Sequence, residues 1–148
     1  IEHLEKARSY YNHLDKNNLM APCLIDLSYL YYLYGDAVKA HSFINQAQSI
    51  LDTRLTNNNL SFNCKALLFL YKKEDESTLD ELNIFLDEVK SKNYYQPYRI
   101  LYKVYNQKKD QKKADECKEE WNQYVNKLAN NITNPDQKNS YLNNSLIA

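Results

Sequence analysis

Residues 21–51, APCLIDLSYLYYLYGDAVKAHSFINQAQSIL, decide the fold class of this chain. The first half of the stretch has an apolar face at helical spacing, made by Leu24, Leu27, Ser28 and Tyr31. After a turn at Gly35-Asp36, a second helical face with the spacing i, i+4, i+7 is made by Ala40, Ile44 and Ala47. Because small alanine side chains let two helices approach closely, the stretch predicts an antiparallel helical hairpin.

The same spacing returns in two further stretches of the chain. From Gln96 onward, both faces and a polar turn recur with every offset unchanged, at Tyr98, Leu101, Tyr102, Tyr105, Ala114, Lys118 and Trp121. Between these stretches, the two faces recur around a somewhat longer turn, at Cys64, Leu67, Leu68, Tyr71, Leu82, Leu86 and Val89. The sequence therefore predicts hairpins at residues 21–51, 60–91 and 96–129.

Both ends of the chain extend this pattern. The spacing of a second helix also occurs about one repeat length before that of the first hairpin, at Ala7, Tyr11 and Leu14. We expect residues 1–18 to be the second helix of a truncated hairpin, so that the chain is a piece of a longer polypeptide. Residues 130–148 contain a helix start at Pro135 and are expected to form a C-terminal capping helix over the last hairpin.

The large-large-small-aromatic face, the Gly-Asp turn and the Ala-large-Ala face resemble the tetratricopeptide repeat, whose period is about 34 residues. The resemblance covers about residues 3–129 and departs at Lys118, where the family prefers a large apolar residue. The usual closing proline of each unit is also absent. The resemblance implies a right-handed α-solenoid of antiparallel hairpins with a protein-interaction role. The segment that starts at Asn134-Pro135-Asp136 looks like the tail that closes repeat arrays in large bacterial multidomain kinases, cyclases and ATPases.

The amino-acid composition limits which fold classes and which kinds of partner are compatible with the chain. One glycine and three prolines are too few for a protein rich in β-hairpins, which favours an all-α fold. With 19 basic and 19 acidic residues the net charge is zero, so we expect no nucleic acid partner and no membrane surface partner. The three cysteines lie far apart in predicted helices, which is typical of buried thiols in a reducing, cytoplasmic protein.

A binding groove is expected on the first helices of the hairpins. In a stack of this type these helices lie on a concave inner surface. Ten residues beside the apolar faces are predicted to form a peptide-binding groove: Ile25, Tyr29, Tyr32, Phe62, Lys65, Phe69, Lys72, Arg99, Lys103 and Asn106. This groove would be aromatic at one end and basic at the other, which suits a protein or peptide ligand with acidic groups.

The sequence contains no pattern that is typical of catalysis. His3, His13 and His41 fall on separate predicted helices, and the chain has neither a Cys-x-x-Cys nor a His-Glu-x-x-His spacing. A single glycine also excludes a glycine-rich phosphate-binding loop. We therefore expect no enzyme activity, no cofactor and no metal.

Three functions remain open. The leading hypothesis is a non-catalytic protein-binding or peptide-binding scaffold within a larger bacterial regulatory or signalling protein. The alternative is a peptide-sensing regulatory domain attached to a DNA-binding or kinase domain. The third is self-assembly into a homodimer through an apolar edge at Leu4, Ala7 and Tyr11.

Overall fold

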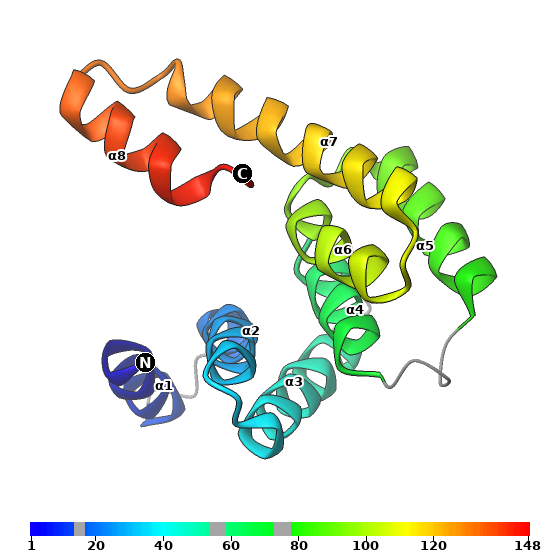
Figure 1. Ribbon diagram of the computed structural model, residues 1–148. Helices are drawn as coiled ribbons and strands as arrows, with labels where there is room; N and C mark the ends of the chain where they lie inside the picture. The colour runs from blue at the N-terminus through cyan, green and yellow to red at the C-terminus, as the bar shows by residue number, and fades with distance from the viewer. Residues whose placement is uncertain (14–16, 54–58, 73–77) are drawn as a thin grey trace. The chain divides into compact units, whose positions relative to one another are not determined.

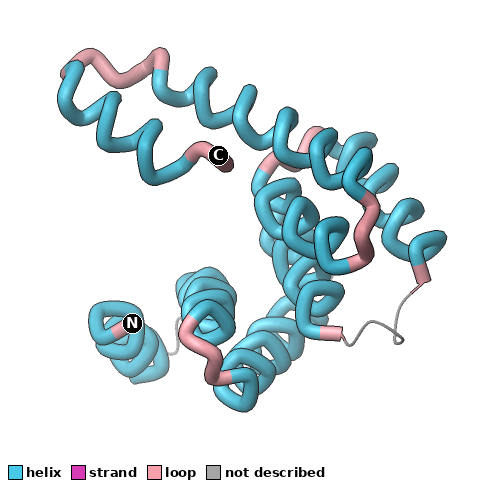
Figure 2. Tube along the Cα trace, in the orientation of Figure 1, coloured by secondary structure: helices cyan, strands magenta, loops and turns pink. Residues whose placement is uncertain are grey.

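The computed structural model describes residues 1–13, 17–53, 59–72 and 78–148 of the chain. In these residues all regular secondary structure is helical, which confirms the all-α class (Figure 2). The chain divides into two compact units, Ile1–Lys72 and Lys73–Ala148. The first unit holds α1 (Glu2–His13), α2 (Asn17–Leu33), α3 (Ala37–Asp52) and α4 (Asn59–Tyr71). The second holds α5 (Leu79–Lys92), α6 (Gln96–Gln107), α7 (Gln111–Ala129) and α8 (Pro135–Ser145) (Figure 1).

The first unit is centred on α2, against which α1, α3 and α4 all pack. The predicted apolar faces of α2 and α3 form the core of this unit, together with residues of α4; its fully buried members are Leu27, Ala40, Ile44, Ala47, Ala66 and Leu67. One polar side chain, Ser28, lies in this core and donates a hydrogen bond of 2.7 Å to the carbonyl of Ala40. The Tyr71 hydroxyl lies 2.8 Å from the same serine oxygen, so a single hydroxyl connects α2, α3 and α4.

A short turn, residues 34–36, joins α2 and α3. Gly35 has a φ of 83°, and its N–H donates to the carbonyl of Tyr32 at 3.0 Å. The N–H of Asp36 reaches back to the carbonyl of Tyr31 at 2.9 Å, which completes a Schellman motif. The Asp36 carboxylate then caps α3 by accepting a hydrogen bond from the Lys39 N–H at 3.1 Å. The residue that closes one helix therefore starts the next.

The turn between α6 and α7 repeats this geometry within the second unit. Lys109 takes the place of the glycine with a φ of 60°, and its N–H donates to the carbonyl of Asn106 at 3.1 Å. The N–H of Asp110 donates to the carbonyl of Tyr105 at 3.0 Å, and its carboxylate accepts from the Lys113 N–H at 3.1 Å. The two turns therefore share each of these hydrogen bonds, although one uses glycine and the other lysine at the left-handed position.

The second unit is built on the α6–α7 hairpin, with α8 packed along α7. Tyr105 is fully buried, and its hydroxyl donates a hydrogen bond of 2.8 Å to Asn83 of α5. Lys90 of α5 forms an ion pair with Glu116 of α7. These contacts fix α5 to the hairpin. Figure 1 shows α8 returning beneath α7; its role as a cap of a repeat array stays a prediction.

The helix positions differ from the sequence prediction at the start of the first hairpin. We expected it to begin at Ala21, but α2 begins at Asn17 and contains Pro22. Leu4, Ala7 and Tyr11, the edge expected to mediate self-assembly, are half-buried on α1, and the thiol of Cys23 donates to the Leu4 carbonyl at 3.2 Å. Leu14 lies outside the described residues. The solenoid, and the pairing of α4 with α5 from different units, stay predictions.

Candidate functional site

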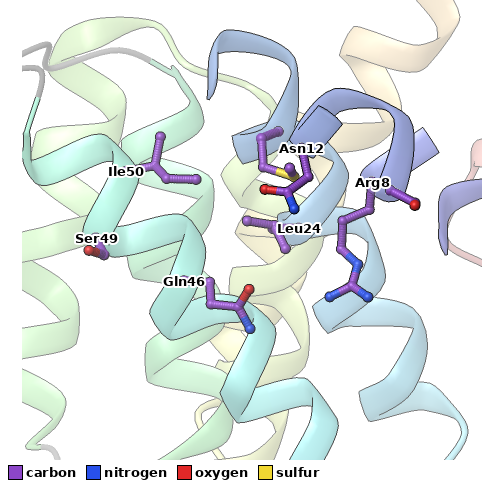
Figure 3. Close-up of a pocket in the computed structure, with 8 residues that line it drawn as sticks. Arg8, Asn12, Leu24, Gln46, Ser49 and Ile50 are labelled. Atoms are coloured by element: carbon purple, nitrogen blue, oxygen red, sulfur yellow. The ribbon is translucent and has the colours of Figure 1, made fainter. Parts of the chain in front are cut away.

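A pocket of about 440 Å³ lies between α1, α2 and α3 in the first unit. Five polar and three apolar residues line it: Arg8, Ser9, Asn12, Met20, Leu24, Gln46, Ser49 and Ile50. Figure 3 shows Arg8 and Asn12 reaching in from α1, Gln46 reaching in from α3, and Leu24 of α2 between them. The pocket therefore has an apolar floor and polar walls.

Helical spacing explains why these side chains converge. Residues four positions apart lie on one face of a helix, and this spacing joins Arg8 to Asn12, Met20 to Leu24, and Gln46 to Ile50. Because α1 and α3 both pack on α2, their neighbouring faces leave a hollow above the buried Leu24. Three of the polar lining residues, Arg8, Asn12 and Gln46, lie next to a position of the predicted apolar faces, so their side chains stand at the rim of the core.

Arg8 is the charged residue among the described side chains that line the pocket. Its Nη2 lies 3.2 Å from Oε2 of Glu5, and its guanidinium lies over the ring of Phe43, 5.1 Å from the centroid. Glu5 is itself held by the Tyr31 hydroxyl, which donates to Oε1 at 3.1 Å. The guanidinium is therefore oriented by residues of all three helices that form the pocket.

One donor of this guanidinium lacks an acceptor. Nε of Arg8 is buried and has no hydrogen-bond partner among the residues that the structure describes. A buried charged donor without a partner is costly. Nε itself is shielded from solvent, but the Arg8 side chain as a whole is 38% exposed, so an anionic ligand can approach the rest of the side chain. The amides of Asn12 and Gln46 provide both donors and acceptors nearby, which is the pairing that a peptide backbone requires.

None of the ten residues predicted to form the groove lines this pocket. Ile25, Phe62 and Phe69 are only 6%, 5% and 8% exposed, so these three side chains pack in the interior. Tyr29 and Tyr32 are half-buried, and the ring of Tyr32 lies 5.0 Å from that of Tyr71.

The remaining predicted residues are more accessible. Lys65 and Lys72 are exposed, and Lys72 lies over the ring of Phe69 at 5.1 Å. Arg99, Lys103 and Asn106 belong to α6 of the other unit, where Arg99 is exposed and lies 5.9 Å from the ring centroid of Trp121. A groove that joins the two sets stays a prediction.

The pocket was not predicted from the sequence, because its polar residues belong to α1 and α3, whereas the groove was expected on the first helices of the hairpins. The feature of the sequence that could have indicated the pocket is the pair of polar positions beside the apolar face of α1, Arg8 and Asn12. Sequence alone gives these residues the same status as any solvated helix surface.

Among the described residues, the three histidines lie on two helices. His3 and His13 lie on the same helix, α1, which corrects the prediction of separate helices, because α1 is continuous from Glu2 to His13. His41 lies on α3. Among the described residues, no group of three or more histidine, cysteine, aspartate or glutamate side chains could hold a metal ion.

The three cysteines are buried and free, as far as the described residues show. Burial raises the pKa of the Cys64 and Cys117 thiols to about 12, and it also raises the pKa of Cys23. A thiol with a raised pKa is a poor nucleophile, because the thiolate is the reactive form. These cysteines therefore serve as core residues.

No helix in the described part of the chain has the length and apolar character needed to cross a bilayer. Comparisons of the chain with protein-family models, curated proteins and solved structures find no match. The resemblance to tetratricopeptide repeats therefore rests on the residues and local geometry of this chain alone.

Proposed function

We propose that this chain is a non-catalytic binding module of tetratricopeptide-like hairpins that holds a peptide or a segment of another protein. The observation that carries the proposal is the pocket between α1, α2 and α3, which is lined by the Arg8 side chain that Glu5 and Phe43 orient. The two matching turns, one in each unit, support the repeat character of the chain.

The lining of the pocket suggests the chemistry of the ligand. A volume of about 440 Å³ falls within the range of roughly 300–1,000 Å³ that is usual for ligand sites. Arg8 favours a carboxylate, since arginine forms its strongest hydrogen bonds with anionic oxygens. Met20, Leu24 and Ile50 offer contact to an apolar side chain beside that acidic group. The ligand that fits best is an acidic peptide segment with at least one apolar residue.

The cellular setting that we propose is the one that the resemblance to tetratricopeptide repeats implies. The chain would recruit its partner within a larger regulatory or signalling protein in the cytoplasm of a bacterium. No chemistry is required of the chain, because holding the partner is the function.

To test the proposed binding function, a displayed library of random peptides is selected on the unaltered chain and on an Arg8→Gln variant. We expect enriched peptides to be acidic and to bind the variant at least about 10-fold more weakly, because a charge-assisted hydrogen bond contributes about 1.5–3 kcal/mol. Raising the salt concentration should weaken binding to the unaltered chain.

Lys65→Gln is the matched control, because Lys65 is exposed, belongs to the same unit and is outside the pocket. Circular dichroism would verify that both variants fold. A loss of binding in Lys65→Gln alone would move the site to the groove predicted from the sequence. No enriched peptide on the unaltered chain would refute the proposed binding function.

A further inference from the structure

The last residue of α8 and the segment after it are held on α7 by side chains that bond to their main chain. Nε1 of Trp121 donates to the carbonyl of Ser145 at 2.7 Å. Asn122 makes two hydrogen bonds with Ile147: Oδ1 accepts from the N–H at 2.9 Å, and Nδ2 donates to the carbonyl at 2.9 Å. Leu146 between them is extended, with φ −69° and ψ 144°.

The two bonds of Asn122 involve the groups that a residue in an antiparallel strand exchanges with its neighbour. A side-chain amide here takes the place of a partner strand. The two Asn122 bonds go to the N–H and carbonyl of Ile147, which any extended residue other than proline provides, whereas the Trp121 bond goes to the carbonyl of Ser145, the last residue of α8. Asn122 therefore recognises extended main chain, and the side chains of Ser145 and Ile147 make none of these bonds.

A second hollow continues from this contact along α7. It has a volume of about 400 Å³ and is lined by polar side chains of one helix face: Asp115, Lys118, Glu119, Asn122, Gln123 and Asn126. Asn122 belongs both to the hollow and to the contact with Ile147. Figure 1 shows α8 returning beneath α7 and the C-terminus beneath the middle of that helix. An extended segment longer than residues 145–147 would thus find polar partners on α7 beyond Asn122.

We propose that this face of α7 is a docking site for an extended segment of a partner protein, and that residues 145–147 occupy it as an internal ligand that the partner displaces. This inference is independent of the proposed function of the other unit, since the residues that carry it all belong to α7, α8 and the segment after α8. The tail competes from within the same chain, so the partner must make additional contacts in the hollow to displace it.

The test uses the full chain and a synthetic acetylated peptide, Asn-Asn-Ser-Leu-Ile-Ala, which is the sequence of residues 143–148. Trp121 is the only tryptophan of the chain, so its fluorescence reports directly on this site. Ile147→Pro removes the N–H that donates to Asn122 and releases the tail. We expect the peptide to bind Ile147→Pro at least about 10-fold more tightly than the unaltered chain, because the internal competitor is weakened.

Two controls test the recognition of main chain. Adding Asn122→Asp to Ile147→Pro should abolish binding of the peptide, because the carboxylate cannot donate to a carbonyl. A peptide with proline at the isoleucine position should not bind to any of the variants. Equal binding of both peptides to Ile147→Pro would overturn the proposal.

A measurement on the unaltered chain tests displacement even if Ile147→Pro does not fold. At saturating peptide, hydrogen exchange at the Ile147 amide should become faster, because the tail leaves Asn122. Unchanged exchange with the peptide bound would place the peptide elsewhere and refute the inference. If the peptide at millimolar concentration bound neither the unaltered chain nor Ile147→Pro, that result would also refute the inference.

Discussion

Replacing Lys109 by glycine should stabilise the chain, because Lys109 holds a left-handed backbone conformation that glycine adopts without strain. Lys109 has a φ of 60° in the turn between α6 and α7. The turn between α2 and α3 has the same hydrogen bonds but places Gly35 at this position, with a φ of 83°. The two turns thus form a matched pair in which one residue type is suited to the conformation and the other is not.

The expected change in the free energy of unfolding follows from two opposing effects. A left-handed conformation costs a residue with a Cβ atom roughly 1–2 kcal/mol. Glycine also gives the unfolded chain more conformational entropy, which lowers the gain by about 0.4–1 kcal/mol. Lys109→Gly should therefore raise the free energy of unfolding by about 0.5–1 kcal/mol. Gly35→Ala should lower it by a similar amount, since a Cβ at Gly35 meets no atom within 4 Å and only the backbone strain remains.

Urea unfolding followed by circular dichroism measures both effects. For an m-value of about 2 kcal/mol per molar urea, the midpoint should shift by about 0.3–0.5 M in opposite directions for the two substitutions. Lys109→Ala controls for loss of the exposed lysine side chain and should give no gain, because the strain persists. A lower midpoint for Lys109→Gly would refute the reasoning, as would an equal gain for Lys109→Ala.

Three further predictions concern a buried hydroxyl, a partly exposed ion pair and the buried thiols. Ser28→Ala should lower the free energy of unfolding by about 1–3 kcal/mol, because it removes the buried hydroxyl shared by Ala40 and Tyr71. Combining it with Tyr71→Phe should cost less than the sum of the two single changes, and additivity would contradict the bond. The hydrogen bond from Lys90 lowers the pKa of Glu116 in the folded state. The stabilisation by this pair is therefore present above the unfolded-state pKa of 4.5. It is lost as the pH falls through the lower folded-state pKa. Thermal unfolding across this acid range should be less pH-dependent in Glu116→Gln than in the unaltered chain. The three cysteine thiols should resist an alkylating reagent at pH 8 until urea unfolds the chain, as followed by mass spectrometry, since burial raises the pKa of each thiol.

The sequence by itself determined the helices and their buried faces. Leu27 and Ala40 of the first hairpin and Leu101 and Ala114 of the last are all fully buried, as their spacing predicted. The Gly35-Asp36 turn was also predictable from its residues. Helix periodicity, capping and turn geometry depend on residues within a few positions of one another, so a local pattern is sufficient to encode them.

The tertiary structure alone decided which side chains meet at the candidate sites. Burial of Ile25, Phe62 and Phe69, which the sequence assigned to a groove, depends on how neighbouring helices cover them. The placement of Arg8 over Phe43, and of Asn122 against Ile147, depends on how segments that are not neighbours in the sequence pack together. Polar residues carry no helical signal of their own that specifies a partner, because any solvated helix face presents the same residue types. The positions of Arg8 and Asn122 in sites of specific geometry therefore follow from packing, and from no local pattern.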